Sequence, residues 1–315
     1  MKDYVGLWFE AYEKLNEPAA IHFILEKNNT QTEIIVPHKL MDGAGALFNL
    51  GQENGFTVTP IKKEIKINPP TKWKYFFNCI KFIYWTRSCG NKLWNFKLLK
   101  VLEPAITLQS WLTLSLSDSS LLKTKAASQR ISLNTLLFHT LDAELSLKFE
   151  LENKKRSWWI PVNMRSDLGI DPGDPKTQRN YASNFTLDLF GNPTALDTQL
   201  KISESLKKQK HWATWWWQLI GRFLPFATIK LIAKNKLANN QHVGAFTNLG
   251  EWESVPKDIN IVFMAHPLLS HPICASCLIF NGKINLALRI YPTFPLTQDE
   301  LKKLILTWKQ RLFDF

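Results

Sequence analysis

The chain has 315 residues, of which 45% are hydrophobic and 21% are charged, and this composition excludes a disordered or collagen-like protein. We expect one large domain or two small ones. The formal net charge is +12, and four cysteines are too few for a disulfide framework, so we expect a reducing compartment.

Helices and strands alternate along the chain, which indicates a mixed α/β fold. The spacing of apolar residues predicts helices over 3–16, 72–100, 118–128, 132–150, 194–211, 213–238 and 297–312. Alternating patterns predict strands over 20–27, 31–37, 106–116, 157–163, 182–190, 243–248, 259–265, 273–280 and 283–291. Gly282 predicts a tight hairpin between the last two strands. Rossmann and P-loop motifs are missing, which disfavours a nucleotide-dependent dehydrogenase or kinase.

The positive charge is concentrated in two stretches that are also rich in Trp and Phe. Residues 61–100 contain ten basic residues and one acidic residue, and residues 207–236 contain seven basic residues and no acidic one. Such a mixture suits a bilayer surface, so the predicted helices at 72–100 and 213–238 are candidate membrane contacts. Packing of the same helices into the core is the alternative interpretation. Nucleic acid is not an expected partner, because neither stretch contains a nucleic-acid-binding motif.

Neither a signal peptide nor a membrane-spanning helix is predicted. The N-terminus lacks an apolar run before a cleavage site, and the most apolar window, 214–233, contains Arg222, Pro225 and Lys230. We therefore predict a cytoplasmic protein, with the inner face of a membrane as a peripheral location.

The motif with the clearest chemistry is His38-Lys-Leu-Met-Asp42-Gly43, directly after a predicted strand. A histidine in this position can point into a cleft and, with an ordinary pKa of about 6.5, take a proton from a hydroxyl or amine. Asp42 can fix the turn by pairing with an arginine, and Gly43 is expected to supply a backbone geometry that a side chain would forbid. These three residues form the predicted catalytic motif.

With this motif the sequence resembles the chloramphenicol acetyltransferase-like superfamily, which includes peptide condensation domains, wax ester synthases and plant HxxxD acyltransferases. The family motif is HHxxxDG; Pro37 replaces its first histidine, and His38 aligns with the second, catalytic one. Later segments resemble family segments in the same order, at residues 130–135, 160–165, 179–181 and 246–250. The resemblance covers residues 20–312.

The resemblance implies an α/β fold of two subdomains, each with a mixed sheet covered by helices. We place the N-terminal subdomain at residues 1–105 and the C-terminal one at 106–315. Because only 37 residues precede His38, the N-terminal subdomain is expected to be shortened.

The resemblance also implies an acyltransferase in which His38 is the general base. The activated hydroxyl or amine of an acceptor, expected to be lipid-related, would attack a thioester carbonyl, with Thr247 or Asn248 donating a hydrogen bond to the oxyanion. Arg165 would pair with Asp42. The co-substrate would be acyl-CoA or an acyl-carrier thioester, and no bound cofactor or metal is expected.

Several alternatives stay open. A carrier-dependent, amide-forming condensation enzyme would take its donor from a separate acidic carrier protein, which suits the net charge. The other alternative is a non-catalytic lipid- or protein-binding member of the same fold.

Asn163 is interpreted as a turn-forming residue. Cys274 and Cys277, with His266 and His271 nearby, have the composition of a zinc site, but positions three apart on a strand face opposite sides.

Overall fold

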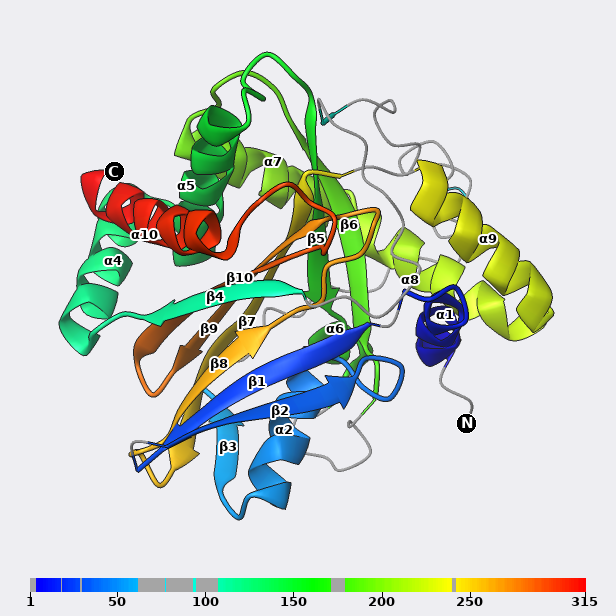
Figure 1. The fold of residues 1–315 in the computed structure, drawn as a ribbon, viewed down its shortest axis with the longest axis horizontal. Coiled ribbons are helices and arrows are strands. Elements are labelled where there is room, and N and C mark those ends of the chain that lie inside the picture. The colour runs from blue at the N-terminus through cyan, green and yellow to red at the C-terminus, as the bar shows by residue number, and fades with distance from the viewer. Residues whose placement is uncertain are drawn as a thin grey trace.

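The computed structural model describes residues 4–61, 107–170 and 179–315, apart from Pro18, Asn29 and residues 240–241, together with Phe77, Leu93 and Trp94. Two sheets and their surrounding helices form a mixed α/β fold (Figure 1), which confirms the predicted fold class. The predicted helix at 72–100 lies almost entirely outside the described residues.

The larger sheet has the strand order β4-β10-β9-β7-β5-β6, with β3 paired to β7. Its strands are β3 (Thr57–Pro60), β4 (Leu108–Thr113), β5 (Arg156–Asn163), β6 (Ala182–Leu189), β7 (Gly244–Val255), β9 (Ile273–Phe280) and β10 (Lys283–Ile290). The pairs β5–β7 and β7–β9 are parallel and the others antiparallel, so the sheet is mixed. The hairpin between β9 and β10 turns at Asn281 (φ 49°) and Gly282 (φ 80°), the two positive φ angles of a type I′ turn.

The smaller sheet has the order β2-β1-β8 and carries the histidine motif at its end. It consists of β1 (Ala20–Lys27), β2 (Thr30–Pro37) and β8 (Asn260–Met264). In the antiparallel pairing of β1 with β8, His22 lies opposite Met264. This pairing and that of β3 with β7 join the two halves of the chain, so a division at 105/106 remains a proposal.

The helices form two groups around the sheets. Helices α4, α5, α7 and α10 cover one face of the larger sheet and share its main apolar core, whereas α1, α8 and α9 lie together at one end of the molecule (Figure 1). A short helix, α2, packs on the smaller sheet. The bounds are α1 (Tyr4–Glu13), α2 (Gly43–Glu53), α4 (Leu116–Ser128), α5 (Leu133–Lys148), α6 (Arg165–Leu168), α7 (Ala195–Lys207), α8 (Lys210–Ile220), α9 (Phe226–Asn239) and α10 (Gln298–Asp314).

Core packing accounts for many of the tryptophans. Six of the described tryptophans are at most 7% exposed: Trp94, Trp158, Trp212, Trp215, Trp252 and Trp308. The indole of Trp158 donates to Asp142 Oδ1 at 2.6 Å, and Arg156 donates to the same carboxylate at 2.8 Å. The indole of Trp158 and the charges of Asp142 and Arg156 are therefore paired, as burial requires.

The single helix predicted over 213–238 is wrong. The segment forms α8, a 3-10 turn at Gly221–Phe223 and α9, because Pro225 cannot continue the helix hydrogen bonding. Trp212 and Trp215 of α8 are buried against Val5 and Met164, so neither indole is free to enter a bilayer. Among the described residues, no helix is both long and apolar enough to cross a membrane.

Removal of one charge of the Asp142–Arg156 pair should destabilise the fold. Both side chains are almost fully buried, so Asp142→Asn leaves a guanidinium without its counter-charge, and we expect a loss of about 3 kcal/mol. Urea unfolding at pH 7.5 measures this loss. The matched control is Glu253→Gln, which removes an exposed pair with Lys257 and should change stability little. Equal effects of the two variants would contradict the assignment.

Candidate functional site

His38 directly follows the last residue of β2. Pro37 pairs with Ala20 at the start of β1, and the His38 amide donates to Ala19 O at 2.9 Å. The predicted placement of the histidine at the end of a strand is therefore confirmed. Two neighbouring strands fix the backbone from which the imidazole projects.

Asn180 determines which nitrogen of His38 carries the proton. Its Nδ2 donates to the carbonyl oxygen of His38 at 2.8 Å, so its Oδ1 is the atom that faces the imidazole Nδ1, 3.1 Å away. An amide oxygen can only accept, so Nδ1 is the protonated nitrogen. The lone pair of Nε2 is then left for chemistry, the tautomer that a general base needs.

Phe9 of α1 covers one face of the His38 ring. The two ring centroids are 3.9 Å apart, and the ring planes differ by 15°. Helix α1 packs on α9, and Lys39 in the histidine turn donates to Glu13 at the end of α1, at 2.8 Å. The imidazole is thus fixed both in its plane, by Asn180, and on its face.

Burial lowers the pKa of His38 below its ordinary value. Hydrogen bonding to the backbone of His38, the charge of Asp42, the hydrogen bond to Asn180 and hydrogen bonding to the backbone of Met41 oppose part of this shift. Burial dominates because a charged imidazolium loses its hydration. The ring is therefore neutral at neutral pH.

Asp42 and Arg165 form a buried ion pair beside the histidine turn. Arg165 Nη1 donates to Asp42 Oδ2 at 2.8 Å, and the two side chains are 1% and 5% exposed. Asp42 also caps α2 by accepting from Gly45 N at 2.9 Å. Asn163 Oδ1 accepts from the backbone amide of Arg165 at 3.1 Å and from its Nη1 at 3.2 Å. The expected pairing of Asp42 with Arg165 is confirmed, and Asn163 supports it.

The same ion pair holds the backbone on both sides of Asn180. Arg165 Nη2 donates to Arg179 O at 2.9 Å, and Tyr181 N donates to Asp42 Oδ2 at 2.6 Å. Asn180, 3% exposed, lies between these two anchor points. The ion pair therefore acts on His38 through Asn180 as well as through the turn.

The reason expected for Gly43 is wrong. Gly43 begins α2 and is not among the residues with positive φ. A side chain would not fit at this position, because its Cβ atom would lie 2.8 Å from Leu249 Cδ2 and 3.1 Å from the ring of Phe263. Gly43 lets the start of α2 approach β7 and β8 closely.

Thr247 and Asn248 lie on β7, outside the hydrogen bonds that surround His38. Asn248 Oδ1 accepts from Gly250 N at 2.8 Å, and its Nδ2 donates to Asn134 at 3.0 Å. Thr247 is half-buried, opposite Ser276 of β9. Neither side chain is a partner of His38, so their roles at an oxyanion stay predictions.

Two residues at the imidazole escaped sequence reasoning. The segment 179–181 resembles a family segment, but that resemblance implies no role for Asn180. Nothing in the sequence links Phe9 to His38, because 28 residues and a hairpin separate them. Only the packing of α1 brings the two rings together.

The two cysteines of β9 have different surroundings. Cys274 Sγ donates to His266 O at 3.0 Å, whereas Cys277 packs in the main core. Burial raises the pKa of both thiols, that of Cys274 to about 12. Both are therefore protonated at neutral pH, which disfavours thiolate chemistry.

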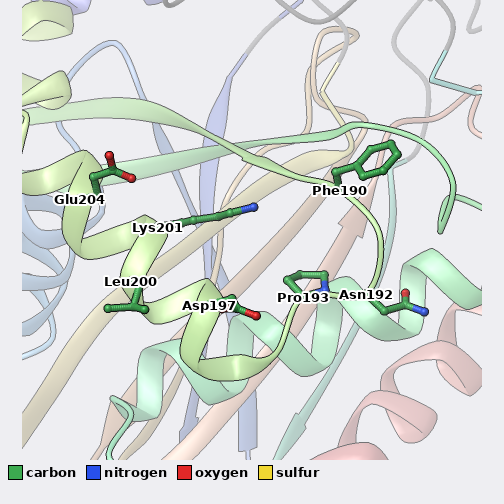
Figure 2. A pocket seen from close by; sticks show the side chains of 7 residues that line it. All are labelled: Phe190, Asn192, Pro193, Asp197, Leu200, Lys201 and Glu204. Carbon is green, nitrogen blue, oxygen red and sulfur yellow. The ribbon is translucent and has the colours of Figure 1, made fainter.

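A surface pocket of about 340 Å³ lies apart from the motif. Figure 2 shows its lining, which comes from α7 and from the connection after β6: Phe190, Asn192, Pro193, Asp197, Leu200, Lys201 and Glu204. No motif residue contributes to it.

Comparison with solved structures identifies the fold as that of condensation domains. Polyketide synthase associated protein 5 from Mycobacterium tuberculosis matches with a TM-score of 0.54 and 14% identity, over 90% of this chain and 72% of that one. The epimerization domain from the third module of tyrocidine synthetase B matches with 0.52 and 14%, over 90% and 68%. The first condensation domain of the CDA synthetase matches with 0.55 and 10%, over 93% and 66%. The chain thus spans about two thirds of these structures. No family model and no curated protein matches.

Arg165 and Asp42 should prove strongly coupled. Arg165→Met leaves the Asp42 carboxylate buried without its cation, and we expect a loss of about 3–5 kcal/mol. The same substitution in an Asp42→Ala background should cost much less, because no carboxylate is then left unpaired. Urea unfolding of the two single variants and the double variant gives the coupling free energy. Additive losses would show that the ion pair does not stabilise the site.

Proposed function

We propose that this chain is a condensation-type acyltransferase that moves an acyl group from a carrier-protein thioester to an amine or hydroxyl acceptor. The observation that carries the proposal is the neutral His38, whose Nδ1–H is donated to Asn180 and whose Nε2 is left as a base. The condensation-domain fold supports the same chemistry.

The proposed reaction has two proton transfers through one nitrogen. His38 Nε2 takes the proton of the acceptor N–H or O–H while the acceptor atom attacks the thioester carbonyl. When the tetrahedral intermediate collapses, a C–N or C–O bond has formed, the C–S bond breaks, and the departing sulfur takes the proton back from Nε2. Asn180 Oδ1 stabilises the transient imidazolium by accepting its Nδ1–H. Thr247 and Asn248 remain the proposed donors to the oxyanion.

The carrier-bound donor is preferred to free acyl-CoA because the similar structures are named as condensation domains and parts of peptide synthetases. A net charge of +12 would suit an acidic carrier. The alternative is a free acyl-CoA donor with a lipid acceptor at a membrane surface. The burial of Trp212 and Trp215 weakens this alternative, and the exposed side chains of Phe223 and Leu231 favour it.

The non-catalytic alternative also has an observation in its favour. Phe9 covers one face of the imidazole, so a substrate must reach Nε2 from the ring edge or the opposite face. A binding protein of the same fold would not need access to Nε2, so Phe9 could cover the ring without loss of function. Turnover that depends on His38 separates the two proposals.

We expect acyl transfer that is lost on His38→Ala. The purified chain is incubated with an acyl-carrier thioester or with acyl-CoA, and with a panel of amines, alcohols and lipids; thiol release and product mass are measured. The loss should be at least about 100-fold, as for a general base. The matched control is His139→Gln on α5, a half-buried histidine beside Phe315 and away from the motif. Turnover that survives His38→Ala would refute the proposed base.

The pH dependence gives an independent test. Because the pKa of His38 is lowered, its neutral form persists below pH 6.5, so kcat/KM should stay level at neutral pH and fall only as pH drops below about 6.5. Asn180→Ala removes a contact that favours the charged imidazole, and it should move the inflection to lower pH. An inflection above 6.5 would contradict this assignment.

A further inference from the structure

Arg289 of β10 is a buried cation at the junction of the two sheets. It is 3% exposed and lies opposite Gln109 of β4 and Cys274 of β9 in the larger sheet. Its Nη1 reaches across to Ala20 O at the start of β1, at 3.4 Å. The guanidinium therefore lies where the smaller sheet crosses the larger one.

Among the described residues, Arg289 has no carboxylate partner. Its Nε is buried without a hydrogen bond, and within the described residues the long contact to Ala20 O is the one hydrogen bond that its side chain makes. Glu33 acts on it only at a distance, because the Glu33 carboxylate accepts from His22 at 2.7 Å and from Gln109 at 3.3 Å. Burial lowers the pKa of Arg289 to about 10, which still leaves it charged.

The other two fully buried arginines are arranged differently. Arg156 and Arg165 each donate to a carboxylate at 2.8 Å, to Asp142 and Asp42 respectively. A buried charge without such a partner is costly, and a protein keeps one where something else supplies the partner. A structural role alone does not explain why Arg289 differs.

A second unpaired donor or acceptor lies in the same region. His266 Nδ1 is buried without a hydrogen bond. The pKa of His266 is held well below its ordinary value, first by burial and then by the charges of Arg289, His22, His271 and His38. His266 is thus within electrostatic reach of both Arg289 and the proposed base.

The start of β1 connects Arg289 to the strand that precedes His38. Its contact, Ala20, pairs with Pro37, which precedes His38, and the neighbouring Ala19 accepts from the His38 amide. Adjacent strands are about 5 Å apart. The start of β1 therefore lies between the Arg289 guanidinium and the backbone of His38.

We propose that Arg289, assisted by His266, binds an oxyanion group of the substrate, a carboxylate or a phosphate, beside His38. This inference rests on the proposed function and narrows its substrate class to an acidic acceptor or an acyl group with an acidic end. The planar guanidinium offers several N–H donors, which match the two oxygens of such a group.

Binding of small probes tests the inference without turnover. Benzoate and benzamide have the same shape but differ in charge, and inorganic phosphate represents the other source; calorimetry at low salt measures their affinities. We expect benzoate or phosphate to bind and benzamide not to. Arg289→Gln should weaken this binding about 10- to 100-fold, as expected for a hydrogen bond to a charged group. Binding of benzoate but not phosphate would identify a carboxylate, and the reverse a phosphate.

Two controls keep the outcome clear. Arg222→Gln removes an exposed arginine and should leave anion binding unchanged. If Arg289→Gln does not fold, the 15N resonance of Arg289 Nε in the unaltered chain should still shift with benzoate and not with benzamide. Equal affinities for the charged and neutral probes, or an unmoved resonance, would overturn the inference.

The proposed function and this inference can fail separately. His38→Ala should retain anion binding. If no acyl transfer is found but binding still depends on Arg289, the anion site stands and the proposed function is wrong. If transfer occurs and Arg289→Gln leaves KM unchanged for every acidic substrate, the function stands and the anion site is wrong.

Discussion

The buried ion pair between Asp42 and Arg165 is the interaction on which the candidate site depends. One carboxylate ends the histidine turn, caps α2 and accepts from Tyr181 N, while its arginine partner holds Arg179 O. The pair therefore joins the smaller sheet to the segment before β6. Without it, the turn and the backbone around Asn180 would each lose an anchor.

The tautomer of His38 follows from this arrangement. Both neighbours of Asn180 are anchored, and its amide hydrogen-bonds both the ring Nδ1 and the backbone carbonyl of His38. Asp42 thus directs a proton on a ring that it does not contact through a hydrogen bond. In this site a carboxylate positions the imidazole through the backbone, and an amide oxygen is the partner of Nδ1.

Local patterns predicted the local features of the fold. The strand before His38 and the hairpin at Gly282 each depend on residues close in sequence, whereas the cap that Asp42 makes on α2 was seen only in the structure. Predictions failed where the cause lies far along the chain. A glycine is needed at position 43 because Leu249 and Phe263 lie too close for a side chain. The strand β3 was not predicted because its four residues pair with β7, which is distant in the sequence.

The same limit explains the tryptophans and the imidazole contacts. Basic residues beside Trp look alike on a membrane-facing helix and on one that packs against a core, and only burial distinguishes them. Phe9 reaches the His38 ring from α1, and Asn180 reaches it from the segment before β6. No spacing rule connects them, so their grouping had to come from the structure.

The pairing of β1 with β8 has a consequence for how the chain assembles. During synthesis the N-terminal part emerges first, yet the sheet that carries His38 gains its third strand only when residues 260–264 have been made. Until then the apolar side chains of Ile21, Phe23 and Leu25, all buried in the finished core, lack one of their neighbours. Such distant contacts slow folding. The sheet that carries the histidine site is therefore completed only after β8 has been made, although the motif itself is translated well before β8.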